Sequence, residues 1–234
     1  MQYSSPLIAA TLIRRYKRFL ADVELASGEV ITVHSPNTGS MLGCAEPGMR
    51  VWIRDTANPK RKYRYAWELS ETVDGVLINI NTIFSNKLVR EGVESGVVEE
   101  LQGYTDIKAE VRYGTQDSRI DLLLSDGDQR CYVEVKNVTA RIDSAMAIFP
   151  DAVTSRGARH LQELMQMVES GHRAVMLFCI SRGDIDQMRA AYEIDPLYAR
   201  TLKQAVDCGV EAMAYVTSAT HIEIALSHRI PVQI

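Results

Sequence analysis

The sequence predicts an α/β protein that begins with a small β-barrel and continues into a domain with a mixed sheet. The first observation is a series of strand-like segments, without a long amphipathic helix, up to about residue 82. The second is a change at residue 83, where apolar residues begin to recur at helical spacing. The third is the mixture of strand-like and helical segments that follows. We therefore expect two domains, residues 1–82 and residues 83–234.

The barrel is predicted from five strand-like segments, with the turns Ser27-Gly28 and Asp74-Gly75 marking two of the breaks. In residues 62–71, KYRYAWELSE, apolar and aromatic residues alternate with Arg, Ala, Glu and Ser. This alternation predicts a half-buried strand with one aromatic face toward the core. The five segments are residues 7–25, 29–35, 50–56, 62–71 and 75–80.

The second domain is predicted to start with a helix from about residue 83, whose apolar positions extend to Leu101 and whose N-cap is Asn81, Thr82 or Ser85. The turn at residues 126–128 joins two strands into a hairpin. Asp195 and Pro196 suit the N-cap and N1 positions of the last helix. The expected strands are residues 107–113, 119–125, 131–138, 174–180, 211–217 and 221–226, and a further helix covers residues 154–170.

Composition indicates an ordinary globular protein, with 46% hydrophobic and 24% charged residues. No apolar stretch approaches the roughly 20 residues of a membrane span, and the N-terminus lacks a signal-peptide pattern, so we expect a cytoplasmic protein without a membrane partner. The cysteines stand singly, which predicts buried free thiols: Cys44, Cys131, Cys179 and Cys208. The net charge is −4, yet the first 82 residues carry ten Lys or Arg against eight Asp or Glu. The barrel is therefore the more basic part.

Charged residues interrupt the two apolar strands of the predicted hairpin. Asp121 lies within RIDLLLS, and Glu134 and Lys136 alternate with valines in CYVEVKNV. A one-residue gap in a strand places Glu134 and Lys136 on one face, and the hairpin brings Asp121 beside them. Three charged groups are thus expected to converge on one spot.

A divalent cation would relieve the repulsion between the two carboxylates. Mg²⁺ or Mn²⁺ could take oxygen ligands from Asp121, Glu134 and the Val135 carbonyl, while Lys136 stands beside a phosphate or an attacking water. Glu91, on the preceding helix, could hold a metal-bound water. The spacing alone favours an ordinary surface ion pair, because a short D…ExK pattern often arises by chance.

Several longer segments carry a resemblance to a known family. NTIFSNKLVREGV, EVRYGTQDSRIDLLL, CYVEVKNVT, FPDAVTSRGARHLQEL, GHRAVMLF and IDPLYA occur in this order. They resemble the sugar fermentation stimulation protein A family of bacteria and archaea, from about residue 8 to the C-terminus. The resemblance implies an OB-like N-terminal barrel followed by a restriction-endonuclease-like, PD-(D/E)xK nuclease fold.

The resemblance also implies roles for individual residues. The metal-binding Asp of that superfamily falls on Asp121, its acidic residue on Glu134, its catalytic Lys on Lys136 and its helix Glu on Glu91. Members are generally described as non-specific DNA binders, sometimes as regulators of sugar metabolism, so nuclease activity is implied by the motif alone. Two positions depart from the family pattern: Ser85 replaces a Pro and Glu193 replaces a His.

Further candidates surround the hairpin, each with a structural alternative. Arg119 could contact a phosphate or pair with Asp121, and Glu110 could be another ligand or a plain strand charge. His160 is a candidate proton carrier or a packed helical histidine. Arg156 suits phosphate binding or solvation equally, and Asn137 could merely shape the hairpin.

Two basic clusters in the barrel suit nucleic acid, since OB barrels combine a basic groove with aromatic stacking. They flank Tyr16, Tyr63 and Tyr65. The alternative is that these tyrosines are core and the cations solvated. The first cluster is Arg14, Arg15, Lys17 and Arg18, and the second is Lys60, Arg61, Lys62 and Arg64.

The leading hypothesis is a DNA-binding protein with a Mg²⁺- or Mn²⁺-dependent nuclease site. The rival is a non-catalytic, non-specific DNA-binding protein with a regulatory role in sugar metabolism. A sugar-processing enzyme ranks last, because the carboxylate pair comes with a Lys, as phosphate chemistry requires. A homodimer is expected only by analogy with related folds that pair two sites to cut both strands.

Overall fold

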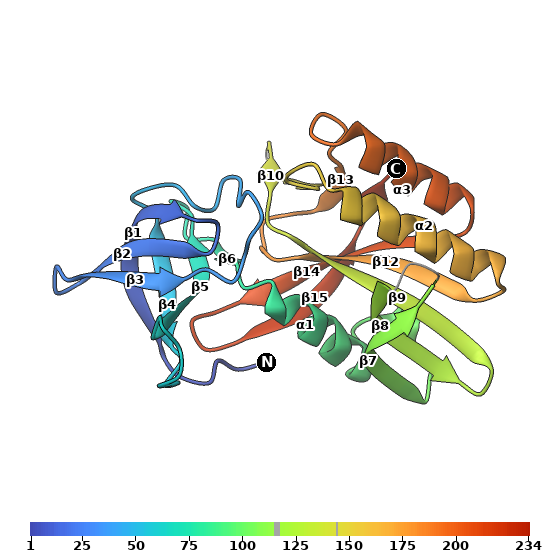
Figure 1. The fold of residues 1–234 in the computed structure, drawn as a ribbon, viewed down its shortest axis with the longest axis horizontal. Coiled ribbons are helices and arrows are strands. Elements are labelled where there is room, and N and C mark those ends of the chain that lie inside the picture. The colour runs from blue at the N-terminus through green and yellow to red at the C-terminus, as the bar shows by residue number, and fades with distance from the viewer. Residues whose placement is uncertain (115–117, 144) are drawn as a thin grey trace.

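The computed structural model describes residues 1–114, 118–143 and 145–234. It confirms the predicted α/β class: a barrel lies at one end of the long axis, and a mixed sheet with helices lies at the other (Figure 1). None of the helices in the described ranges is long and apolar enough to span a membrane.

The barrel is a sheet of strand order β3-β2-β1-β4-β5-β6, closed by a pairing of β3 with β5 between His34 and Ala66. Its core includes Leu12, Val51 and Trp67, all essentially without solvent exposure. The strands are β1 (Leu7–Tyr16), β2 (Leu20–Leu25), β3 (Val30–His34), β4 (Arg50–Asp55), β5 (Tyr65–Glu71) and β6 (Leu77–Asn79).

The segment expected as one strand over residues 7–25 is two strands, β1 and β2. The chain reverses at Lys17 and Arg18, whose φ angles are 50° and 65°. Positive φ is uncommon outside glycine, and neither residue is a typical turn former. The sequence pattern therefore does not reveal this turn.

The prediction that one face of β5 is exposed to solvent is wrong, because both faces of this strand are buried. Glu68 has no solvent exposure. It accepts hydrogen bonds from Arg54 Nε at 2.8 Å and from Asn81 Nδ2 at 2.6 Å. Since Asn81 lies in the connection to the second domain, Glu68 faces the joint between the domains.

The second domain is built on a sheet of order β15-β14-β12-β9-β8-β7. Strands β9, β12 and β14 are parallel, and the outer pairings are antiparallel. The sheet is therefore mixed, as expected. Its strands are β7 (Asp106–Tyr113), β8 (Ser118–Asp126), β9 (Gln129–Val138), β12 (Arg173–Ile180), β14 (Glu211–Ala219) and β15 (Ile224–Ile230).

Helices cover both faces of this sheet (Figure 1). One face carries α1 (Ile83–Glu94), and the other carries α2 (Ser155–Glu169), against which α3 (Pro196–Asp207) packs. A second sheet of order β10-β11-β13-β16, which the sequence pattern did not predict, adjoins α3. Its short strands are β10 (Arg141–Ile142), β11 (Met146–Phe149), β13 (Gln187–Ala190) and β16 (Val232–Gln233).

The helix ends agree in part with the sequence. Thr154 accepts from Gly157 N at 3.0 Å, and Asp195 accepts from Tyr198 N at 3.0 Å as the expected N-cap. The helix α1 is shorter than expected, because it ends at Glu94 and Gly96 follows with φ 82°. The apolar pattern continues into a separate turn of 3₁₀ helix, η1 (Glu99–Leu101). Three cysteines are buried as expected, but Cys208 is exposed.

Candidate functional site

The hairpin of β8 and β9 brings together the three residues singled out by the sequence pattern. Leu122 of β8 pairs with Val133 of β9, and the pairing stops there. Beyond that point the Asp121 side chain takes the place of a backbone acceptor, because its Oδ2 accepts from Val135 N at 2.7 Å. The carboxylate of Asp121 therefore lies between the two strands as they separate, beside Glu134.

Both oxygens of Asp121 are held. Oδ1 accepts from Asn86 Nδ2 of α1 at 2.7 Å, and Oδ2 accepts from the Val135 backbone. Burial, and then the nearby charge of Glu134, raise the pKa of Asp121 to about 6. Asn86 was not predicted as a site residue, because a single Asn near a helix start is usually read as a capping residue.

Glu134 is 2% exposed and projects from β9 toward α2. Its Oε1 contacts Lys136 Nζ at 2.5 Å and His160 Nδ1. Although burial favours the protonated form, the hydrogen bond from His160 and the charge of Lys136 hold the pKa of Glu134 below its usual value. Oε2 is buried and has no hydrogen-bond partner among the described residues. One oxygen of Glu134 is thus committed, and the other is open to a ligand.

His160 and Arg156 extend this group of contacts along α2. Arg156 Nε lies 3.2 Å from His160 Nε2 and can only donate to it. Nε2 must then be the acceptor nitrogen, so the ring proton sits on Nδ1 and is donated to Glu134 Oε1. Lys136 Nζ lies 3.4 Å from Nδ1, which is a contact and not a second hydrogen bond. His160 therefore orients Glu134, in agreement with its interpretation as a packed helical histidine.

A further carboxylate, Glu163, adds negative charge to the same interior. It is fully buried on α2, and neither carboxylate oxygen has a partner among the described residues. A Cβ atom added at Gly114 would lie 3.0 Å from its Oε1. Burial, followed by the charges of Glu134, Glu163 and Asp121, raises the pKa of Tyr113. Lys136 offsets part of this negative charge through its pair with Glu134, and the remaining charge would favour a bound cation.

Glu91 does not join these residues. Its carboxylate pairs with the α-ammonium of Met1 at 3.1 Å, and its side chain is 49% exposed. Five residues separate it from Asn86, which turns it about 140° away around the helix. Asn86 therefore makes the contact between α1 and Asp121, whereas Glu91, expected to hold a metal-bound water, faces away from the site.

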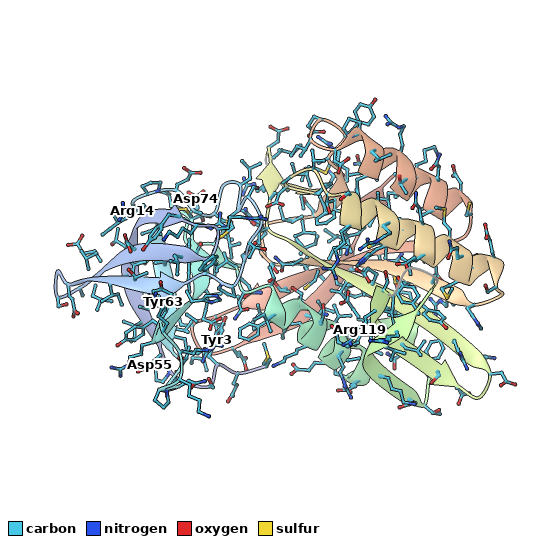
Figure 2. All side chains as sticks on the ribbon, in the orientation of Figure 1. Tyr3, Arg14, Asp55, Tyr63, Asp74 and Arg119 are labelled. Carbon is cyan, nitrogen blue, oxygen red and sulfur yellow. The ribbon has the colours of Figure 1, made fainter. Side chains whose placement is uncertain are left out.

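Glu110 and Arg119 lie on the two strands next to Asp121. The β7–β8 register would place Glu110 opposite Asp121, but the pairing skips this position, where Glu110 has a φ of 56°. Its side chain is exposed and makes no hydrogen bond or ion pair within the described ranges. Arg119 is exposed on β8 and has no polar partner there either (Figure 2). Arg119 does not pair with Asp121 and remains available to a phosphate.

Asn137 follows Lys136 and faces α1. Its Oδ1 accepts from Ser85 Oγ at 2.8 Å and from Ser181 Oγ at 2.5 Å. It therefore ties the end of β9 to α1 and to the end of β12. The serine that departs from the family pattern, Ser85, is one of these partners.

The first basic cluster is largely engaged within the barrel. Arg15 donates to the carbonyl oxygens of Asn37 and Gly39 at 3.0 and 2.8 Å, and Arg18 donates to Thr38 O. Arg14, exposed on the barrel (Figure 2), pairs with Asp22 at 2.8 Å and lies over the Tyr16 ring. Lys17 makes no ion pair in the described structure. The cluster therefore mainly stabilises the loop of residues 37–40, and less of its positive charge is available to a ligand.

The second basic cluster remains open to solvent. Arg64 pairs with Asp55 at 2.6 Å, but Lys60, Arg61 and Lys62 are exposed and form no ion pair within the described residues. His34, Arg61, Lys62 and Tyr63 line a depression of about 280 Å³. Tyr63 lies on the barrel surface (Figure 2), outside β5, with Lys62 Nζ 5.6 Å from its ring centroid. This loop combines cations with an aromatic ring.

The donor set at the hairpin fits a hard divalent cation. Asp121 and Glu134 supply carboxylate oxygens, and the unpartnered Glu134 Oε2 is the open position. Across the described ranges, no three His, Cys, Asp or Glu side chains are close enough to hold a metal ion by themselves. A cation here would keep several waters, as Mg²⁺ usually does.

Comparisons with known proteins give a consistent picture. Family models match residues 13–80 ("SfsA N-terminal OB domain") and residues 83–223 ("Sugar fermentation stimulation protein RE domain"). A sugar fermentation stimulation protein homolog from Thioalkalivibrio sulfidiphilus is 55% identical over 92% of this chain and 90% of its own. One from Geobacter metallireducens is 52% identical over 99% of each. The structure of Pyrococcus furiosus SfsA in complex with Ca²⁺ superposes with a TM-score of 0.90 at 28% identity, covering 100% of this chain and 98% of that one.

Proposed function

The chain belongs to the sugar fermentation stimulation protein family, and on that premise we propose that it binds DNA and hydrolyses its phosphodiester bonds with a divalent metal ion at Asp121, Glu134 and Lys136. The observation that carries this proposal is the convergence of the buried Glu134 carboxylate, the half-buried Asp121 carboxylate and a lysine, with Glu134 Oε2 left without a partner among the described residues. An ordinary surface ion pair would be exposed, whereas Glu134 is 2% exposed.

Mg²⁺ or Mn²⁺ bound to Asp121, Glu134 Oε2 and the Val135 carbonyl would supply Lewis-acid activation of the phosphate and of a water molecule. The Ca²⁺ in the Pyrococcus furiosus relative supports a site for hard divalent cations. Asn86 and the Val135 N–H orient the Asp121 carboxylate, and His160 orients that of Glu134. These contacts fix both carboxylates before a ligand arrives.

Lys136 supplies positive charge next to the reacting phosphate. Its Nζ lies 2.5 Å from Glu134 Oε1, so its position is set by the same carboxylate that would hold the metal. An ammonium group at this place stabilises negative charge that develops on phosphate oxygens. Arg119, exposed and unpaired on β8 within the described residues, can contact a neighbouring phosphate.

DNA would reach this site along the second basic cluster. Lys60, Arg61 and Lys62 provide phosphate contacts, and Tyr63 provides a ring on which a base can stack. A protein of net charge −4 needs such a local basic surface to attract a polyanion.

The second candidate function is DNA binding without hydrolysis, in a regulatory role in sugar metabolism. It is favoured by the small number of protein ligands, because no group of three metal-binding side chains forms among the described residues. In that case the basic cluster would carry the function, and affinity would fall steeply with salt.

Cleavage of labelled single-stranded, duplex and branched DNA with Mn²⁺, Mg²⁺ or EDTA tests the proposal, with binding recorded in the same samples. We expect metal-dependent products that disappear in Asp121→Asn and Lys136→Met while DNA binding persists. Lys108→Met is the matched control, because Lys108 pairs with Asp106 on the exposed strand β7. DNA binding without cleavage products on every substrate would contradict the nuclease proposal and support DNA binding without hydrolysis.

A further inference from the structure

A cavity of about 200 Å³ lies where the two domains meet. It is far larger than the roughly 30 Å³ share of one water, and smaller than the roughly 300–1,000 Å³ of pockets for drug-sized ligands. The space is therefore large enough for a single ring system and too small for a drug-sized ligand. Its walls include Asn37 and Thr38 from the barrel, Thr82 from the joint, and Asn137, Phe149 and Asp151 from the second domain.

The barrel side of this cavity is rigidly held. Arg15 donates to the carbonyls of Asn37 and Gly39, as described above, which fixes the backbone of the loop. Asp151 Oδ2, on the other domain, accepts from Ser40 Oγ at 2.8 Å and from Met41 N at 3.1 Å. The cavity thus exists before a ligand binds, which lowers the entropic cost of binding.

The cavity presents unpaired hydrogen-bonding groups. Asn37 is 5% exposed, and its Oδ1 accepts from Gly39 N at 2.8 Å, yet its Nδ2 donates to nothing in the described structure. Asn137 is in the same condition: Oδ1 accepts from two serines, and no contact of Nδ2 is found among the described residues. Asp151 uses only Oδ2, so Oδ1 remains an acceptor. Two amide donors and one acceptor thus remain unpaired, within the described residues, on side chains that line the cavity.

Apolar side chains form a smaller part of the wall, beside Thr82 and Thr139. Val138, Ile148 and Phe149 line the cavity, and the Phe149 ring is fixed by edge contact with Tyr198 at 5.2 Å between centroids. A lining that combines amide and carboxylate groups with a few apolar side chains can match the edge and the faces of a nucleobase. A phosphate would instead require cations, and the lining contains no Lys or Arg.

The cavity and the metal-type site are connected through residues that are neighbours in the sequence. Asn137 directly follows Lys136 on β9, and its partner Ser85 directly precedes Asn86, which holds Asp121. We infer that this cavity binds one unpaired nucleobase of the DNA strand, beside the phosphate held at Asp121, Glu134 and Lys136. This inference rests on the proposed function and specifies its substrate class: a strand with at least one unstacked base, such as single-stranded or branched DNA.

A scan with abasic nucleotides tests the inference. Binding of single-stranded oligonucleotides, each with one abasic position, is followed by fluorescence polarisation in Ca²⁺, the ion bound by the Pyrococcus furiosus relative. We expect one position at which loss of the base weakens binding roughly tenfold, the effect expected for one well-held base. Continuous duplex should bind more weakly than the intact single strand, because its bases must first be unpaired.

Thr38→Trp is the blocking variant, because Thr38 is exposed at the cavity and its hydroxyl makes no hydrogen bond within the described residues. It should remove the difference between intact and abasic strands. Ser27→Trp, in the exposed β2–β3 turn, is the control and should keep that difference. Equal affinities at every abasic position, or a difference that survives Thr38→Trp, would overturn the inference. Wild-type protein that binds no DNA at all would instead refute the proposed function itself.

Discussion

At the scale of the residue, Asp121 is a site where the charged carboxylate proposed for metal binding lowers the stability of the metal-free fold. Its carboxylate is half-buried beside Glu134, and its pKa is raised to about 6. The folded protein therefore binds a proton at Asp121 more tightly than the unfolded chain does, whose Asp titrates near 3.8. Stability contributed by the protonated form is present below about pH 4 and is lost as pH rises to about 6.

We predict that Asp121→Asn stabilises the metal-free fold above pH 6. The new amide cannot ionise, and its hydrogen bonds require only that Asn86 turn its own amide. The gain should be on the order of 2 kcal/mol at pH 8 and should vanish near pH 4. Urea unfolding in EDTA at several pH values measures it. A gain that is the same at pH 4 and pH 8 would contradict the assigned titration.

His160 offers a second prediction, because its two ring nitrogens have different partners. In His160→Asn the amide nitrogen can replace Nδ1 and keep the contact with Glu134, whereas His160→Gln places its amide nearer Arg156. Mn²⁺ affinity should therefore stay within about threefold in the Asn variant and fall about 10- to 100-fold in the Gln variant. His172→Asn, a half-buried histidine against Tyr132, is the control. Equal losses of Mn²⁺ affinity in both His160 variants would show that His160 does not orient Glu134.

The sequence alone was sufficient to place Asp121, Glu134 and Lys136 together, because strand alternation and a hairpin turn determine which side chains share a face. The sequence was insufficient to show that Asn86, and not Glu91, contacts the site from α1. Their distinction depends on where α1 begins and how it is rotated on the sheet, which tertiary packing decides.

At the scale of the element, the two basic clusters have different structural uses. The β1–β2 turn directs Arg15 and Arg18 to backbone carbonyls of the loop of residues 37–40. The β4–β5 loop leaves Lys60, Arg61 and Lys62 in solvent. Residue type alone cannot distinguish these uses, since an unexpected turn with positive φ at Lys17 and Arg18 sets the direction of the first cluster.

We predict that substitutions in the first cluster lower stability, whereas substitutions in the second cluster lower DNA affinity. Arg15→Ala should lower the thermal midpoint, because it removes the side-chain donor from the partly buried bonds to the carbonyl oxygens of Asn37 and Gly39. The triple variant Lys60→Ala, Arg61→Ala, Lys62→Ala should fold normally, lower DNA affinity and reduce the salt slope by up to about 2 for single strands. Polarisation measured over a salt series tests this. An unchanged slope in the triple variant would place the DNA surface elsewhere.

At the scale of the whole molecule, a buried ion pair of the barrel lies beside the joint with the second domain. Glu68 has no exposure, and it is held by Arg54, whose side chain is 16% exposed, and by Asn81 in the joint. Asn79 N also donates to Ser181 O at 2.8 Å, which adds a backbone contact between the domains. The position of the barrel relative to the site is therefore defined by specific contacts.

We predict that Arg54→Ala destabilises the protein by about 3 kcal/mol, because it leaves the Glu68 carboxylate buried without its cation. Adding Glu68→Gln should recover part of that loss, since the buried charge is then absent. Arg64→Ala, which breaks the exposed pair with Asp55, should cost at most about 1 kcal/mol. Urea unfolding compares the three. Similar losses for Arg54→Ala and Arg64→Ala would show that the joint does not depend on Glu68.

The domain order and fold class were predictable because strand alternation and helical periodicity are properties of short segments. The contacts at the joint between the domains were not predictable, because strand alternation assigns the position of Glu68 to solvent. Its burial depends on contacts with Arg54 of the neighbouring strand and Asn81 of the joint, which strand alternation does not reveal. The small sheet of β10, β11, β13 and β16 was missed for a similar reason, since strands of two to four residues are too short for a period to emerge.

The most direct test of the metal site is calorimetric titration of the wild-type chain with Mn²⁺. The geometry predicts one bound ion per chain and at least a tenfold loss of affinity in Glu134→Gln, which removes a carboxylate ligand. Glu91→Gln is the matched control, because Glu91 pairs with the N-terminus and should leave affinity unchanged. Unaltered Mn²⁺ binding in Glu134→Gln, or an equal loss in Glu91→Gln, would contradict the site.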